Sequence, residues 1–130
     1  MKQLKKFALF IVSAFVLPAM AWADGYHVDG RVIVTDTYLS GSMSVRYNTT
    51  VSGDPYLYAN GFANSSISFV GRDDTGNYFS CSVPTTSGVY KDALDIRNGM
   101  TDGKYIYVTK DASGTECTNV YMLSASYWLE

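Results

Sequence analysis

The sequence predicts a mainly β protein, either an antiparallel β-sandwich or a small closed barrel of six to seven strands, with one short helix over about residues 88–98. Three observations predict this class. Short runs rich in β-branched and aromatic residues alternate apolar and polar side chains, which is the period of a pleated strand. Glycine, asparagine, aspartate and proline separate these runs at short intervals, which favours antiparallel hairpins. One segment only, before Met100, changes to helical spacing.

Two strands are predicted at the start of the domain, over residues 31–38 and 42–48. In the first, Val32 and Val34 alternate with polar residues, and Ser40-Gly41 marks a break. The second alternates more regularly, since one face carries Met43, Val45 and Tyr47 and the other carries Ser44, Arg46 and Asn48. This alternation is typical of a strand with one buried face.

Turn residues delimit three further strands in the middle of the chain. A turn at 52–55 precedes a weaker strand over 56–63, which the hairpin-forming pair Asn60-Gly61 interrupts. A strand over 66–72 is joined by an Asp-Asp-Thr-Gly turn to a strand over 77–83, which Pro84 ends.

A helix is predicted next because the apolar spacing changes to four, three and four at Val89, Ala93, Ile96 and Met100. Tyr90 and Leu94 widen this stripe, Lys91 and Asp95 form an i,i+4 pair on the other side, and Gly99 is placed to end the helix. The last two strands follow over 104–110 and 117–128.

The N-terminal segment has the three parts of a signal peptide. Met1–Lys6 is basic, Phe7–Leu17 is apolar, and Ala21-Trp22-Ala23 offers small residues for cleavage before Asp24. We therefore expect a cleaved signal at 1–23, a flexible lead-in at 24–30 and a single β-rich domain at 31–130. The expected compartment is the periplasm or the medium of a bacterium.

Removal of 23 of the 130 residues leaves 107, with seven basic and twelve acidic side chains and a net charge of −5. No basic patch suited to nucleic acid remains. No second apolar stretch is long enough to span a bilayer as a helix.

Cys81 and Cys117 are the only cysteines, and in an exported domain a single pair favours a disulfide. A zinc site would need further ligands, and the chain has one histidine, His27. A redox motif would need the cysteines close together in sequence, and they are 36 positions apart.

The sequence offers no convincing set of catalytic or cofactor-binding residues, so we expect a protein that is not an enzyme and holds no cofactor. Nucleophile–histidine catalysis lacks a partner for the single histidine, and Asp73, Asp74 and Asp102 stand at turn positions. A hydrolase with paired aspartates remains a weaker hypothesis. A weak calcium site could use Asp111 and Glu116, in a loop with oxygen ligands and a glycine.

Tyrosine is the most unusual feature, because all eleven tyrosines lie after residue 23. Tyrosine packs on half-buried sheets, and it also supplies stiff contact area at binding faces. Candidate ligand-binding residues are the same-face pairs Tyr105 and Tyr107, and Tyr56 and Tyr58, together with Trp128.

The heptapeptide Gly41–Tyr47 resembles a loop motif of small periplasmic lysozyme inhibitors, although its alternation favours a strand here. The resemblance covers seven residues and assigns no family, but it implies that inhibition of a secreted hydrolase is an alternative. The leading hypothesis is an exported, non-catalytic module that binds an unidentified protein or glycan through a tyrosine-rich sheet face. A further alternative is a subunit of an envelope or surface-fibre assembly.

Overall fold

The computed structural model describes residues 30–47, 50–101 and 103–124. The predicted signal peptide and His27, the lead-in up to residue 29, and Trp128 at the end of the last predicted strand lie outside these residues. The described part is mainly β, as predicted, with its strands in two antiparallel sheets and one α-helix.

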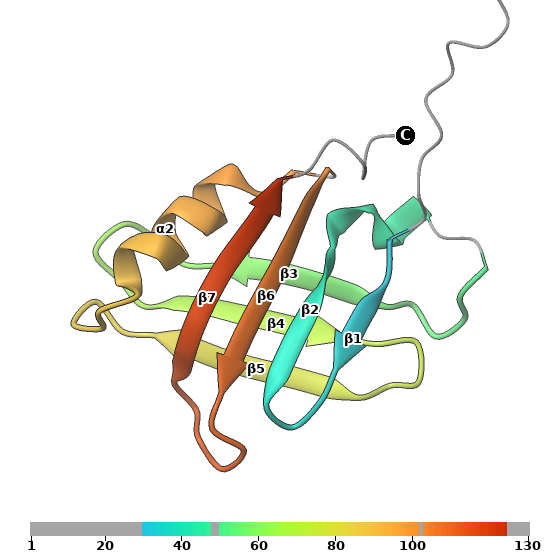
Figure 1. The fold of residues 1–130 in the computed structure, drawn as a ribbon, viewed down its shortest axis with the longest axis horizontal. Helices are drawn as coiled ribbons and strands as arrows, with labels where there is room; N and C mark the ends of the chain where they lie inside the picture. Colours follow the sequence, from blue (N-terminus) through green and yellow to red (C-terminus); the bar gives the residue numbers. More distant parts are fainter. Residues whose placement is uncertain (1–29, 48–49, 102, 125–130) are drawn as a thin grey trace, which may run out of the picture.

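The four-stranded sheet has the order β1-β2-β6-β7. Its strands are β1 (Val32–Val34), β2 (Tyr38–Ser42), β6 (Lys104–Lys110) and β7 (Cys117–Ser124). The three-stranded sheet has the order β3-β4-β5, formed by β3 (Tyr56–Asn60), β4 (Ile67–Arg72) and β5 (Tyr78–Val83). The strands of one layer run across those of the other (Figure 1), and the layers are separate sheets, so the fold is a sandwich and the barrel alternative is wrong.

The core lies between the two layers, and strand alternation explains which residues form it. In the four-stranded sheet, the cross-strand row Val34, Leu39, Val108 and Val120 points inward and is buried. The three-stranded sheet contributes its own alternate residues, which are Leu57, Ile67, Phe69, Phe79, Cys81 and Val83. Because alternate residues point to opposite faces, the rows between these point outward from both layers.

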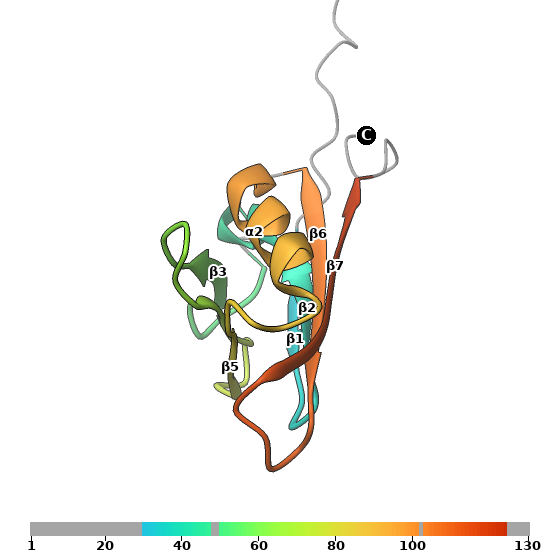
Figure 2. The same cartoon turned by 90° about the vertical axis from the view of Figure 1, so that its left-hand side faces the viewer.

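The α-helix α2 (Tyr90–Gly99) confirms the helix predicted from apolar spacing. It lies at one side of the sandwich, between the planes of the two sheets (Figure 2), and contacts β3, β4 and β7. Ala93 and Ile96 are buried against the core, and the predicted pair of Lys91 and Asp95 forms an exposed ion pair with an Nζ–Oδ2 distance of 2.6 Å.

The prediction of one strand over 31–38 is wrong, because the chain turns after β1. The side-chain oxygen of Thr35 accepts hydrogen bonds from the backbone N–H groups of Thr37 (3.3 Å) and Tyr38 (3.1 Å). This local bonding competes with strand pairing at threonine. The result is a tight β1–β2 hairpin, with Leu39 opposite Val34.

The prediction of a strand over 42–48 is also wrong, because Met43–Tyr47 forms a short 3₁₀-helix, η2. The buried side chain of Ser42 accepts the backbone N–H of Ser44 at 3.2 Å and bonds to the Ser44 hydroxyl at 2.9 Å. Ser44, expected on the polar face, and Val45, expected on the apolar face, are both buried. Alternation alone therefore predicted a strand where the chain forms a 3₁₀-helix.

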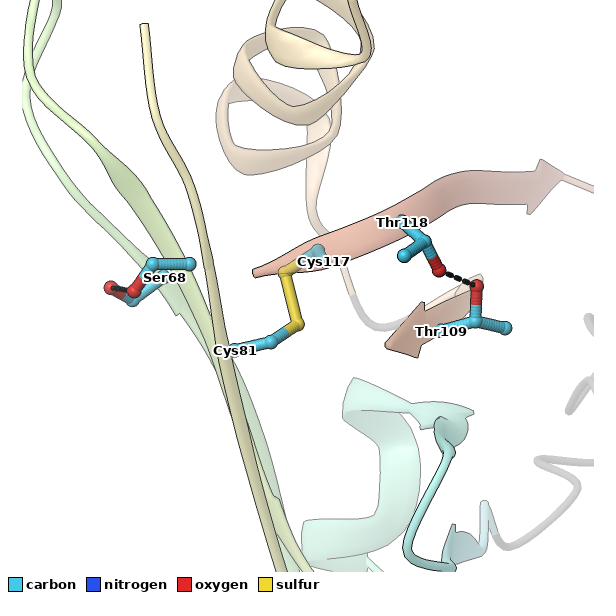
Figure 3. The surroundings of a disulfide bond; sticks show 6 residues. Ser68, Cys81, Thr109, Cys117 and Thr118 are labelled. Atoms are coloured by element: carbon cyan, nitrogen blue, oxygen red, sulfur yellow. Dashed lines mark hydrogen bonds between the residues drawn. A yellow bond between two sulfur atoms is a disulfide. The ribbon is translucent and has the colours of Figure 1, made fainter. Parts of the chain in front are cut away.

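The predicted disulfide between Cys81 and Cys117 is present and joins β5 of one sheet to β7 of the other (Figure 3). Both residues are buried, with Cα atoms 5.2 Å apart. A hydrogen bond from the backbone N–H of Ser82 to the carbonyl of Thr115 (2.9 Å) connects the layers beside it. Within the described residues, no helix is long and apolar enough to cross a membrane.

Candidate functional site

Three tyrosines stack across the outer face of the four-stranded sheet. Tyr38 lies on β2, Tyr107 on the adjacent β6 and Tyr121 on the edge strand β7. The ring centroids of Tyr38 and Tyr107 are 5.4 Å apart with an interplanar angle of 23°, and those of Tyr107 and Tyr121 are 5.3 Å apart at 31°. We call these three residues the tyrosine ladder.

Strand register explains the ladder. Tyr107 is directly opposite Tyr121, and Tyr38 is diagonal to Tyr107 because its own partner is Thr109. Direct and diagonal neighbours on one face of a sheet are both within reach of aromatic side chains. Each ring pair contributes about 0.5–1.5 kcal/mol beyond simple burial, so the ladder is fixed before any ligand arrives.

The surroundings of the ladder are apolar or hydroxyl-bearing. The row that contains Tyr107 and Tyr121 continues through the buried Ser40 to Ile33, which is 49% exposed. The next row along the strands pairs Ser42, Tyr105 and the exposed Leu123. These side chains are uncharged, and the exposed Arg31 lies beside Ser42 at the β1 edge of the sheet, where its carbonyl accepts the Ser42 N–H. By strand alternation Arg31 shares the face of Ile33, so this face combines aromatic, aliphatic and hydroxyl groups with a positive charge at its β1 edge.

The predicted pair Tyr105 and Tyr107 therefore shares the expected outer face, opposite the buried Ile106 and Val108. Both tyrosines are half-buried, and Tyr107 contacts two other rings. Tyr38 and Tyr121 were not among the ligand-binding residues predicted from sequence. Each could have been found only with the pairing order of β2, β6 and β7.

The other predicted pair, Tyr56 and Tyr58, lies on the opposite side of the molecule. These rings stack with centroids 6.0 Å apart on the outer face of the three-stranded sheet, and both are exposed. The structure thus does not bring the two pairs together into one surface. Trp128, the remaining candidate, falls outside the described residues.

The carboxylate of Asp73 is buried and belongs to the β4–β5 turn. Its Oδ1 accepts hydrogen bonds from the backbone N–H groups of Thr75 (3.0 Å) and Asn77 (2.9 Å) and from the Thr75 hydroxyl (2.8 Å). Its Oδ2 accepts one from the Asn77 side-chain amide at 2.8 Å. Burial alone would raise the pKa of Asp73, but these hydrogen bonds outweigh it and hold the pKa below 3.8.

The calcium hypothesis at Asp111 and Glu116 gains no support from the structure. Both residues are exposed in the β6–β7 connection, where the carbonyl of Asp111 accepts the backbone N–H of Gly114 at 2.8 Å. Among the described residues, no group of three histidine, cysteine, aspartate or glutamate side chains could hold a metal ion. The site remains a prediction from sequence.

Comparisons with protein-family models, curated proteins and solved structures give no match. The tyrosine ladder and its surroundings must therefore be interpreted from their own geometry.

Proposed function

We propose that this chain is an exported, non-catalytic interaction module that binds a protein partner through the tyrosine ladder. The observation that carries the proposal is the row of three stacked tyrosines on the outer face of the four-stranded sheet. The centres of protein interfaces are enriched in tyrosine and depleted in charge, and the residues around the ladder on β2, β6 and β7 match that composition. The basic and apolar N-terminal segment supports export, and a disulfide is typical of compartments outside the cytoplasm.

The orientation of the rings favours a protein over a glycan at this face. Tyr107 stands between two other rings, with Tyr38 on the β2 side and Tyr121 on the β7 side. A sugar that stacks on tyrosine needs an open ring face, whereas a protein surface can pack against ring edges and hydroxyls. Because the rings already hold one another, binding costs little side-chain entropy.

A photo-crosslinker placed at Tyr121, on the edge of the ladder, tests the proposal. In the cells that encode the chain, we expect p-benzoylphenylalanine at this position to give a discrete crosslinked protein band. Ile33→Asp puts a charge on the same row of the face at an exposed position and should abolish the band. The matched control places the crosslinker at Tyr58, an exposed tyrosine on the opposite sheet.

A band of the same size from Tyr58, or no band from Tyr121, contradicts the proposal. Tight co-sedimentation with an insoluble polysaccharide that requires Tyr107 would instead identify a glycan site. Unfolding curves of the Ile33→Asp variant and the parent chain show whether a lost band reflects lost folding.

Inhibition of a secreted hydrolase is a second candidate, favoured by the β3–β4 turn. Phe62 is 78% exposed at this turn. Ser65 braces the turn, because its hydroxyl accepts the Phe62 N–H and donates to the Phe62 carbonyl, both at 2.9 Å. The Tyr90 hydroxyl of α2 donates to the Ser65 carbonyl at 2.9 Å. A rigid turn that presents one exposed aromatic ring suits insertion into a cleft.

A lysozyme activity assay separates this candidate from the first. Inhibition that Phe62→Ala abolishes and Ile33→Asp preserves would favour the turn over the ladder. The heptapeptide Gly41–Tyr47, which suggested inhibition from sequence, contributes to η2 and has its Ser44 and Val45 buried. The resemblance therefore does not place an inhibitory loop there.

A further inference from the structure

Strand β7 forms one edge of the four-stranded sheet, and this edge has little protection against pairing with another chain. With eight residues, β7 is the longest strand of the described part, and it contains no proline and no charged residue. Edge strands are usually short, charged or interrupted by proline, because an open edge otherwise accepts a further strand. A bulge at the start of β7, where the register with β6 shifts between Thr109 and Lys110, is the protection that remains.

The other sheet edges differ from β7 in this respect. At the opposite edge of the same sheet, β1 has only three residues and follows the exposed, charged Arg31. In the three-stranded sheet, the edge strand β3 contacts η2 and α2. The edge strand β5 is tied to the other layer by the disulfide and by the hydrogen bond from the Ser82 N–H to the Thr115 carbonyl. Of the edges that the structure describes, β7 is therefore the best suited to accept a strand.

The outer edge of β7 has unpaired backbone groups. Among residues 30–47, 50–101 and 103–124, backbone hydrogen bonds join β7 to β6 alone. Alternate N–H and C=O groups of an edge strand point away from its single neighbour. Figure 2 looks at this edge, and no other strand covers β7 there. The pairing with β6 is regular over residues 119–124, so this part of the edge can serve as a template.

The position beside β7 suits a single extended segment better than a second copy of the chain. Helix α2 contacts β7 and lies past it on the inner side of the sheet (Figures 1 and 2), where Gly99 packs against Met122. Two copies that paired their β7 strands about a twofold axis would place both helices and both three-stranded sheets on one side of the joined sheet. The helix of each copy would then meet the second layer of the other. A lone segment brings no second layer and would lie over α2.

The outward side chains of β7 indicate the chemistry of the segment. Tyr121 and Leu123 are 49% and 38% exposed on the outer face, and the exposed Asn119 precedes them on the same face. On the β6 side, Tyr107 and Tyr105 lie opposite Tyr121 and Leu123. Cross-strand neighbours on one face of a sheet stabilise each other when both are aromatic or apolar. A segment with apolar or aromatic residues at alternate positions would match this edge.

We propose that the edge of β7 binds an extended segment of a partner protein, with apolar side chains at alternate positions, which joins the sheet as a fifth strand. Backbone hydrogen bonds supply the affinity, and Tyr121 and Leu123 supply the selectivity. A single added strand buries a small area, so we expect weak binding. The proposal concerns the strand edge, and it does not depend on the tyrosine ladder binding a partner.

Nitrogen-15 NMR titration of the purified chain, with its disulfide intact, tests the proposal with a synthetic peptide of the β6 sequence Lys104–Lys110. This peptide is a suitable probe because β7 already pairs with that sequence along its other edge. We expect saturable shifts of the backbone amide signals of residues 119–123 and slower hydrogen exchange at alternate amides among them. A fully N-methylated peptide of the same sequence should not bind, because it keeps the side chains and lacks the backbone donors.

Leu123→Lys places a charge on the outer face of β7 at an exposed position. It should weaken peptide binding about tenfold, because a lysine on an edge strand opposes pairing and repels the lysines of the probe. The matched control is Ile33→Lys, which adds the same charge at an exposed position of β1 on the same face. This control should leave peptide binding unchanged.

Absence of saturable shifts, or equal binding of the N-methylated peptide, overturns the proposal. Shifts centred on Ile33 and Tyr38 without slower exchange in β7 also overturn it, and they would show binding to the ladder face instead. Shifts of the 119–123 signals that appear when the chain alone is concentrated would overturn the choice of occupant and identify a second copy. Equal weakening by Leu123→Lys and Ile33→Lys would contradict a role for this edge.

Discussion

Replacement of Asp73 by asparagine tests whether the buried carboxylate stabilises the β4–β5 turn. The carboxylate accepts four hydrogen bonds from Thr75 and Asn77. Asparagine keeps one acceptor oxygen, but its amide would face the Asn77 amide, so one hydrogen bond becomes a contact between two donors. Hydrogen bonds to charged groups contribute about 1.5–3 kcal/mol each, and we expect Asp73→Asn to lower the unfolding free energy at pH 7 by about 2–3 kcal/mol.

The effect has a defined pH dependence. Because the pKa of folded Asp73 lies below 3.8, its contribution is complete above the unfolded pKa and is lost as the pH falls through the folded pKa. Stability of the parent chain should therefore approach that of Asp73→Asn in acid, while the two remain separated at neutral pH.

Urea unfolding followed by circular dichroism measures both quantities. The matched control is Asp74→Asn, since Asp74 is exposed in the same turn and its side chain makes no hydrogen bond with the described residues. This control should change stability by less than about 0.5 kcal/mol. A similarly small effect of Asp73→Asn at pH 7, or a difference that does not shrink in acid, would refute the reasoning.

Three further predictions concern the core and the ladder. Replacing Cys81 and Cys117 together by alanine should lower the unfolding free energy, measured in urea, by about 4 kcal/mol, because the disulfide restricts a 36-residue loop in the unfolded chain. A loss below about 1 kcal/mol would argue against a structural cross-link. Gly71→Ala should cost about 1–3 kcal/mol in thermal unfolding, since a Cβ at Gly71 would clash with the side chain of Leu39 on the facing sheet. An unchanged melting temperature would contradict this close approach. Tyr107→Ala removes two ring pairs and should lower the unfolding free energy by about 1–3 kcal/mol. It should also change the near-ultraviolet circular dichroism spectrum, and an unchanged spectrum would show that the rings do not stack in solution.

The strands that the sequence predicted correctly are those with one strictly buried face. In β4 and β5 the alternate residues are buried and the intervening ones are not, apart from Val70. In β6 the alternates Ile106 and Val108 are buried, and the other residues of the strand are half-buried. The helix was equally predictable, because the spacing of Ala93 and Ile96 places both against the core. In these elements the hydrophobic pattern and the tertiary environment agree.

Local hydrogen bonding by small polar side chains was not predictable from alternation. Thr35 and Ser42 each bind backbone N–H groups that a longer strand would have used, and they produce a hairpin turn and a 3₁₀-helix instead. Serine and threonine carry both tendencies, so only the packed structure decides between them. The same limit explains the incomplete candidate site, because Tyr38 and Tyr121 join Tyr107 through pairing between strands distant in sequence.

The position of Cys117 bears on how the sandwich is completed during synthesis. Cys81 lies in β5, but its partner belongs to β7, which must also pair with β6. Covalent closure of the two layers therefore waits until β7 has been synthesised. A chain cut short before this strand would keep an unpaired thiol in the three-stranded sheet and would leave the β7-facing edge of β6 unpaired.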